Sequence, residues 1–391
     1  MRGRSTGNVI STTNGDAIPF SSNGVRLSIR QWLVVGVTMV ALLIFLPRLW
    51  PQVEKFEPQA DYRVPSDLSD DYWLYERYCK WACSRDKILV IGDSAIRGFY
   101  VPAGATLSHY FNELAGGDEF ANLAVDGLHP VALFGLLSHY GRDISNKRII
   151  LHLNPLWMSS GKFDLQTDKE FQFHHPKLVP QFVPKIACYK ESISGRIGTV
   201  VERYVDFFSW TSHLQKVYFQ SMDLTAWTLE HPYRNPLSAI TLEVPTAEHY
   251  NPAEHVSWME KSMTKEDFDW VDLSESFQWR FFRRTVDMLR ARGNKVFVLV
   301  GPFNEHILTV AGAETYSKMK SQIESWLQQK TVPYYIAPPL PSELYRDASH
   351  PLSKGYEMLA GQLFESGVFR TFLGEPATAN RFAEDSLSQS R

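Results

Sequence analysis

The sequence predicts an α/β fold with three αβα layers, in which helices cover both faces of a doubly wound, mainly parallel five-stranded sheet. Five short stretches are apolar with little alternation, which is typical of strands buried on both faces of a parallel sheet. They lie at 88–92, 120–125, 148–154, 295–301 and 333–337. Between or after them, apolar residues follow helical spacing at 105–114, 131–140, 277–292, 314–328 and 354–365. Strands that alternate with helices favour right-handed crossovers and a parallel sheet.

The composition fits a large globular domain and argues against several other classes of protein. The chain has 391 residues, of which 44% are hydrophobic and 21% are charged, enough for one large domain or two ordinary ones. The formal net charge of −3 gives no reason to expect nucleic acid as a partner. Three cysteines are too few for a disulfide scaffold. His152, His174 and His175 have no carboxylate or cysteine at convincing ligand spacing, so we expect no metal and no cofactor.

One apolar stretch near the N-terminus predicts a membrane anchor. Residues 1–31 are polar and are expected to be disordered. The predicted transmembrane segment is 32–50, and its uncharged window, 31–47, is at the short end of what spans a bilayer. Trp32 and Trp50 lie at its two ends, as in an aromatic belt. A cleaved signal peptide and a buried core helix are the alternatives, and the long polar region before the apolar run argues against both.

The charges on either side of this segment predict its orientation. Arginines dominate before it, whereas acidic residues outnumber basic ones just after it. The positive-inside rule therefore predicts a cytoplasmic tail, a single-pass anchor in the cell (inner) membrane, and residues 51–391 on the periplasmic or extracellular side. After the anchor we expect a linker at 51–70, a domain at 71–370 and a flexible tail at 371–391. Within the domain, 160–275 lacks clear strand spacing and is expected to be a partly helical insertion.

The stretch KILVIGDSAIRGFY places a serine on the turn that follows the first predicted strand. Substrates bind at the carboxyl ends of the strands in such sheets, so the hydroxyl of Ser94 is a candidate nucleophile. After the fifth strand, the stretch YRDASHPLSKGYEMLA offers His350 as a general base and Asp347 as the acid that orients it. Gly127 follows the second strand and Asn154 ends the third. Their N–H groups, with the backbone N–H of Ser94, are candidate donors to an oxyanion.

Each of these residues also has an ordinary explanation. Gly-Asp-Ser is common at strand exits, Gly127 could serve only the entry to a helix, and Asn154 before a proline could form a plain turn. Asp347 could cap the helix that follows it. Their order along the chain, and their placement after four different strands, favour a common site.

These motifs resemble the sequence blocks of the SGNH (GDSL-type) hydrolase superfamily, which supply Ser, Gly, Asn and His. The likeness lies in IGDSAIRG, in NLAVDGLHP and, most specifically, in DASHPLSKGY. It covers roughly 86–159 and 293–368. Two departures stand out: Ala95 occupies the position of the leucine in the family name, and the usual Gly-x-Asn-Asp of the third block reads HLNP here.

The resemblance implies both a fold and a mechanism. The fold would be flavodoxin-like and of the SGNH hydrolase type, with a large insertion after the third strand. Ser94 would be the nucleophile, His350 the general base and Asp347 its orienter. The oxyanion hole would consist of the N–H groups of Ser94 and Gly127 and the side chain of Asn154.

Four further residues are candidates for contacting substrate: Asp93, Trp157, Asn304 and His306. Trp157 could stack on a sugar, although core packing is the more common role of a tryptophan. Asn304 and His306 follow the fourth strand in a stretch that would also suit the start of a helix.

The layout also resembles a narrower group of bacterial proteins with one N-terminal anchor and an exported SGNH domain, such as the teichoic-acid D-alanylation protein and alginate O-acetylation proteins. The stretch LNPLWMS is similar to a Pro-x-Trp segment in the first of these. This likeness implies a serine esterase or O-acyltransferase that acts on acyl esters of cell-envelope or secreted polysaccharide, beside a membrane-bound O-acyltransferase. Two alternatives stay open: a catalytically silent scaffold on the same fold, and a lipid or small-ester hydrolase.

Overall fold

The computed structural model describes residues 27–246, 256–261 and 263–374. The chain divides into two compact units, 1–46 and 47–391, and each is described by itself. The expected disordered region and the expected flexible tail lie mostly outside the described residues, as does a short part of the expected insertion.

The apolar stretch near the N-terminus forms one long helix, α1, over Ile29–Val53. The helix has 25 residues and a mean hydropathy of 2.2 over its most apolar window. Many of its apolar side chains are exposed, among them Leu33, Val37 and Phe45. Among the described residues it is the one helix that is long and apolar enough to cross a bilayer, which is compatible with a single-pass membrane anchor.

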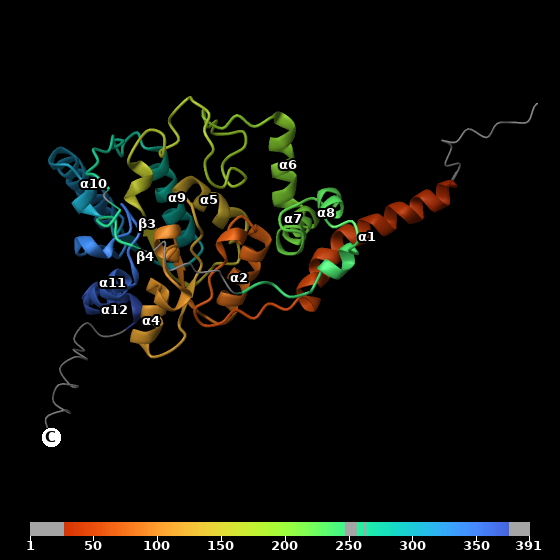
Figure 1. Ribbon diagram of the computed structural model, residues 1–391, viewed down its shortest axis with the longest axis horizontal. Coiled ribbons are helices and arrows are strands. Elements are labelled where there is room, and N and C mark those ends of the chain that lie inside the picture. Colours follow the sequence, from red (N-terminus) through yellow and green to blue (C-terminus); the bar gives the residue numbers. More distant parts are fainter. Residues whose placement is uncertain (1–26, 247–255, 262, 375–391) are drawn as a thin grey trace, which may run out of the picture. The chain divides into compact units, whose positions relative to one another are not determined.

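A sheet of five parallel strands forms the centre of the second unit (Figure 1). Its strands are β1 (Ile88–Ile91), β2 (Phe120–Asn122), β3 (Arg148–Leu153), β4 (Lys295–Val300) and β5 (Tyr334–Ile336). Their order across the sheet is β2-β1-β3-β4-β5, which is the order of a flavodoxin-like, doubly wound fold. The predicted α/β class and the predicted five-stranded parallel sheet are therefore confirmed.

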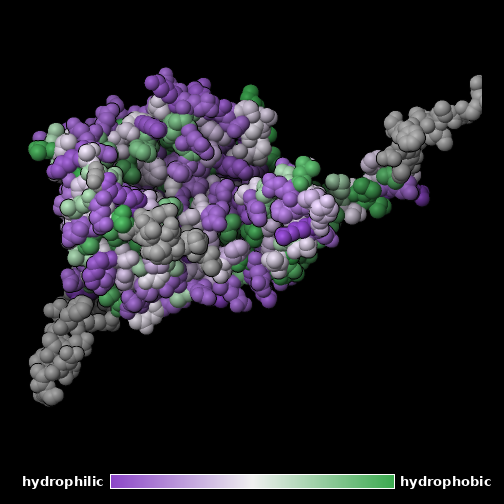
Figure 2. Space-filling model, in the orientation of Figure 1, coloured by the Kyte–Doolittle hydropathy of each residue, from purple (hydrophilic) through white to green (hydrophobic). Residues whose placement is uncertain are grey.

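Helices cover both faces of this sheet. One face is covered by α2 (Tyr72–Ser84), α5 (Pro130–His139), α9 (Phe277–Ala291) and α10 (Val310–Gln329), and the other by α4 (Leu107–Ala115), α11 (Ser353–Glu365) and α12 (Gly367–Leu373). Successive strand residues point to opposite faces, so Leu89 and Ile91 join the first core whereas Ile88 and Val90 join the second. Two buried faces explain why these strands are apolar without alternation. The surface in Figure 2 is correspondingly hydrophilic over most of this unit, with scattered apolar residues.

Capping side chains set where the helices begin. The Ser276 hydroxyl accepts a hydrogen bond from the backbone N–H of Trp279 (3.0 Å), so α9 begins at the predicted residue. Helix α10 begins four residues before its predicted start at 314, because Thr309 caps it by accepting from the N–H of Gly312 (3.1 Å). The segment between β3 and β4 contains α6 (Ile193–Tyr204), α7 (Asp206–Tyr218) and α8 (Leu224–Glu230).

Within the stretch 51–70, which we expected to be a linker, residues 62–65 and Leu68 are buried against the domain. Tyr62, Val64 and Leu68 belong to the first core. The guanidinium of Arg63 is also buried and donates to the backbone carbonyls of Arg97 (2.9 Å) and Val101 (2.7 Å). The sequence pattern missed this packing because the apolar residues here are isolated and follow no period.

A buried ion cluster fastens α7 to the segments near α1 and α2. The imidazole of His213 lies between two carboxylates, with Nδ1 2.6 Å from Asp71 Oδ2 and Nε2 3.0 Å from Glu54 Oε1. All three side chains are almost wholly buried. Burial alone would lower the pKa of His213, but the two carboxylates raise it to about 9. His213 is therefore charged at neutral pH and donates from both ring nitrogens.

We expect His213→Gln to lower the free energy of unfolding by about 3 kcal/mol or more, because it leaves two buried carboxylates without a cation. The pKa of His213 is higher in the folded chain than its ordinary value of 6.5. Its contribution to stability is therefore complete below that value and is lost as the pH rises through about 9.

Denaturant unfolding of the full chain in detergent, repeated across this pH range, measures the effect. His231→Gln, at the end of α8, is a matched control and should leave the pH dependence as in the wild type. Equal pH dependence in the wild type and His213→Gln would contradict the assignment.

Candidate active site

The predicted nucleophile lies at the start of a short helix directly after β1. The chain leaves β1 at Ile91, and Ser94 is the first residue of α3 (Ser94–Arg97). Asp93 caps this helix by accepting from the N–H of Ala95 (3.0 Å). Gly98 ends it with a φ of +82°, a left-handed conformation that favours glycine. The turn brings the Ser94 hydroxyl to the carboxyl edge of the sheet, where its residue is half-buried.

The structure brings Ser94 together with both predicted partners from the other end of the chain. The Nε2 atom of His350 lies 2.9 Å from Ser94 Oγ. The Nδ1 atom of the same ring lies 2.8 Å from Asp347 Oδ1 and 2.9 Å from Oδ2. Serine, imidazole and carboxylate thus form one continuous hydrogen-bonded chain. This is the geometry by which a base activates a serine and an acid orients the base.

Backbone contacts hold the loop that carries the acid and the base. Asp347 Oδ1 also accepts from the N–H groups of Ser349 (2.9 Å) and His350 (3.0 Å). The Tyr356 hydroxyl, on α11, donates to the carbonyl of Ala95 (2.6 Å) and so ties α11 to α3. Both ends of the hydrogen-bonded chain are therefore anchored to the same part of the fold.

The electrostatics of this chain suit His350 as a base. Burial alone would lower its pKa, but the Asp347 carboxylate raises it, with smaller contributions from Asp93 and Asp126. Burial alone would raise the pKa of Asp347, whereas His350 and two backbone N–H groups lower it. Asp347 therefore stays ionised while His350 gains affinity for a proton.

Two of the three predicted oxyanion donors are backbone groups without an acceptor. Among the described residues, the N–H groups of Ser94 and Gly127 donate to no other group. The third donor, the amide of Asn154, is partly used, because its Nδ2 donates to Asp93 Oδ2 (2.8 Å) and its Oδ1 accepts from Leu156 N–H (3.0 Å). An amide nitrogen carries two hydrogens, so one N–H group of the Asn154 side chain has no acceptor among the described residues.

Gly127 occupies a position that only glycine suits. Its φ is +65°, in the left-handed region. A Cβ built there would also lie 2.4 Å from Cγ of His174, which is part of the segment between β3 and β4. The glycine therefore serves a turn and a close side-chain contact. No local sequence pattern predicts that His174 lies against this glycine.

Asp93, which we expected near substrate, is instead the buried centre of the loop beside the nucleophile. It is 2% exposed, and its Oδ2 accepts from Asn154 and from Nε1 of Trp157 (2.7 Å). Its Oδ1 lies 3.3 Å from Nδ1 of His152, which is packed against Gly92. Burial alone would raise the pKa of Asp93, but His152 and Asn154 lower it. An ionised Asp93 thus fixes the positions of Asn154 and Trp157.

The two candidates after β4 contact the backbone of the chain. Asn304 is fully buried, and its Nδ2 donates to the carbonyl of Asp347 (3.2 Å) while its backbone N–H donates to the carbonyl of Ala348 (2.8 Å). These contacts support the loop of the acid. The exposed His306 has its Nε2 2.9 Å from the carbonyl of Leu340.

Sequence reasoning missed a buried arginine that supports the loops around the site. Arg97 has no exposed surface and donates through Nε (3.0 Å) and Nη2 (2.7 Å) to the carbonyl of Val64. Its Nη1 lies 3.5 Å from Oδ2 of Asp126, which also accepts from the hydroxyl of Ser66 (2.6 Å). The Nε2 atom of His175 lies 2.5 Å from the backbone carbonyl oxygen of Asp126. A contact between residues this far apart in sequence leaves no local pattern.

A polar cavity of about 490 Å³ lies beside the hydrogen-bonded chain. Its lining includes Phe99, Asp126, Gln172, His174 and Lys177. The Phe99 ring is 6.5 Å from the His350 ring, centre to centre, and Asp126 directly precedes Gly127. Two of the lining residues are therefore neighbours of the base and of a predicted oxyanion donor.

Comparisons with known proteins add no name to this site. No protein-family model matches the chain, and no curated protein sequence matches it. Among the described residues, no three His, Cys, Asp or Glu side chains are grouped so that they could hold a metal ion. The candidate chemistry therefore rests on Ser94, His350 and Asp347 themselves.

We expect the rate of fluorophosphonate labelling of Ser94 to fall as the pH is lowered, with an apparent pKa above 6.5. Only neutral His350 can accept the serine proton, and Asp347 raises the pKa of His350 above that ordinary value. The pH dependence is measured from labelling rates across the neutral and mildly acidic range. Melting temperatures taken at each pH show whether the chain stays folded. A rate that stays constant while the chain remains folded would contradict the role of His350 as base.

We expect Gly127→Ala to slow labelling on the order of 100-fold, because the strained residue moves an oxyanion donor. The double variant Gly127→Ala/His174→Ala removes the ring contact but keeps the positive φ. It should therefore recover part of the lost melting temperature and part of the rate. Labelling of Gly127→Ala at the wild-type rate would exclude this residue from the oxyanion hole.

Proposed function

We propose that this chain is a membrane-anchored serine esterase or O-acyltransferase of the SGNH type, with its catalytic domain on the periplasmic or extracellular side. The observation that carries the proposal is the unbroken chain of hydrogen bonds from Ser94 through His350 to Asp347. Residues that are 256 apart in sequence meet at 2.9 Å, in the order that acyl transfer requires.

The first half of the reaction forms an acyl-enzyme. The Oγ atom of Ser94 attacks the carbonyl carbon of an ester while its proton passes to Nε2 of His350. The resulting oxyanion accepts hydrogen bonds from the N–H groups of Ser94 and Gly127 and from Asn154. When the intermediate collapses, the C–O bond of the ester breaks, and the departing alcohol takes the proton from His350.

The second half decides between hydrolase and transferase. Water or an acceptor hydroxyl gives its proton to His350 and attacks the acyl carbon, and the bond to Ser94 Oγ breaks as the serine regains a proton. The cavity near the base combines polar side chains, Asp126, Gln172 and Lys177, with aromatic ones, Tyr72, Phe99 and Phe173, a mixture that suits the hydroxyl groups and ring faces of a sugar acceptor. We therefore propose acylated cell-envelope or secreted polysaccharide as the substrate and a membrane-bound O-acyltransferase as a partner.

The test uses the full chain in detergent with a fluorophosphonate probe and with p-nitrophenyl acetate. We expect the wild type to be labelled, Ser94→Ala to lose labelling, and Ser325→Ala, an exposed serine on α10, to label normally. Adding oligosaccharide acceptors then separates transfer from hydrolysis, because only transfer gives an acylated sugar by mass spectrometry. Absence of labelling in a folded wild type would contradict the acyl-enzyme and favour a silent scaffold.

A further inference from the structure

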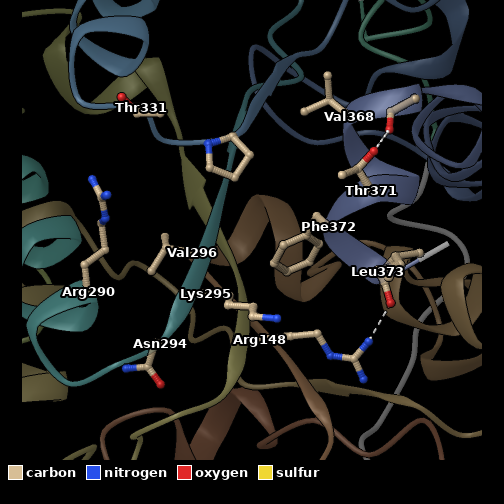
Figure 3. Close-up of a pocket in the computed structure, with 13 residues that line it drawn as sticks. Arg148, Arg290, Asn294, Lys295, Val296, Thr331, Val368, Thr371, Phe372 and Leu373 are labelled. Atoms are coloured by element: carbon tan, nitrogen blue, oxygen red, sulfur yellow. Dashed lines mark hydrogen bonds between the residues drawn. The ribbon is translucent and has the colours of Figure 1, made fainter. Parts of the chain in front are cut away.

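A larger cavity, of about 900 Å³, lies at the edge of the sheet opposite the candidate active site (Figure 3). Its floor is formed where strands begin: Arg148 is the first residue of β3, Lys295 is the first residue of β4, and Pro333 directly precedes β5. Ser94, by contrast, follows the carboxyl end of β1. Because all five strands are parallel, the two sites lie at opposite ends of the sheet.

Two cations lie side by side in this cavity. Arg148 and Lys295 are register partners on adjacent strands. Their side chains lie on the sheet face covered by α12, because they alternate in phase with Ile150 and Phe297 of that core. Figure 3 shows the Lys295 and Arg148 side chains extending in the same direction, toward Leu373. Two like charges so placed repel each other unless an anion lies between or beside them.

The protein itself offers this pair little compensation. One nitrogen of Arg148 donates to the carbonyl of Leu373 (2.9 Å), at the C-terminus of α12. This contact occupies one N–H group of the Arg148 guanidinium and does not involve Lys295. Lys295 is exposed, and within the described residues its ammonium makes no hydrogen bond and no ion pair. Arg290 adds a third cation to the lining, and no described aspartate or glutamate lines the cavity.

The rest of the lining is apolar. Val296, Pro333, Val368 and Phe372 border the space next to the cations. In Figure 3, the Phe372 ring lies beside the Lys295 side chain. Cavities of roughly 300–1,000 Å³ with apolar walls and a few placed polar groups are typical of small-molecule sites. The combination suits a ligand with a negatively charged end and an apolar body.

We propose that this cavity binds a small organic anion whose carboxylate or phosphate head is held by Lys295 and Arg148 and whose apolar body lies against Phe372 and Val368. The free guanidinium N–H groups of Arg148 suit the oxygen atoms of such a head, and Lys295 supplies a point charge. The site is separate from the proposed acyl transfer, and it does not depend on whether Ser94 is active.

The test is ¹⁹F NMR with 4-(trifluoromethyl)phenylacetate and the full chain in lipid nanodiscs, with empty nanodiscs as the blank. We expect saturable binding, and binding weaker by about tenfold for the uncharged amide of the same acid. Lys295→Gln should weaken binding by a similar factor, because it removes a positive charge that binds the anion. The variant should fold normally, because it removes no structural contact. Lys318→Gln, an exposed lysine on α10, is the matched control and should bind as the wild type does.

Two further measurements complete the test. Val368→Trp, which places a larger side chain at the mouth of the cavity from an exposed position, should weaken binding at least as much as Lys295→Gln, and labelling of Ser94 should be unchanged in each variant. A phosphonate probe of the same size identifies the preferred head group, and dependence of either probe on Lys295 supports the site. Absence of saturable binding by both probes, equal binding of the acid and its amide, or wild-type affinity in Lys295→Gln would overturn the proposal.

Discussion

Parallel pairing of all five strands is the constraint on which the rest of this structure depends. In a parallel sheet every carboxyl end lies at one edge and every amino end at the other. Ser94, Gly127, Asn154 and His350 follow strands that are far apart in sequence, and they meet because those strands end together. The same constraint places Arg148 and Lys295, two residues that begin adjacent strands, next to each other at the opposite edge.

The candidate active site is built on buried polar contacts as much as on the sheet. Asp93 fixes Asn154 and Trp157 behind the nucleophile, and Arg97 and Arg63 hold the loops that surround α3. Buried polar groups are costly unless they are hydrogen-bonded, so such a network favours one arrangement of the loops. A preorganised arrangement is what a hydroxyl nucleophile and its oxyanion donors require.

Hydrogen-bond partners also separate the roles of chemically similar groups. Two of the described imidazoles that contact carboxylates show this difference: His350 lies beside Asp347, and His213 lies between Asp71 and Glu54. His213 is enclosed, has a carboxylate at each nitrogen and is fixed as a cation. His350 has a carboxylate at one nitrogen and a serine hydroxyl at the other, so it can exchange a proton. The partner on the second nitrogen, more than burial, decides which of them suits catalysis.

The sequence by itself determined the fold class and the order of strands and helices along the chain, and it predicted that Ser94, Asp347 and His350 lie together. These follow from local properties: apolar runs without alternation, helical spacing, and polar residues at strand exits. Only the tertiary structure decided the burial of 62–65, the contact of His174 with Gly127, the inward position of Asp93 and the pairing of Arg148 with Lys295. Each of these joins segments distant in sequence, and which distant segments meet is set by packing over the whole domain, which no local pattern records.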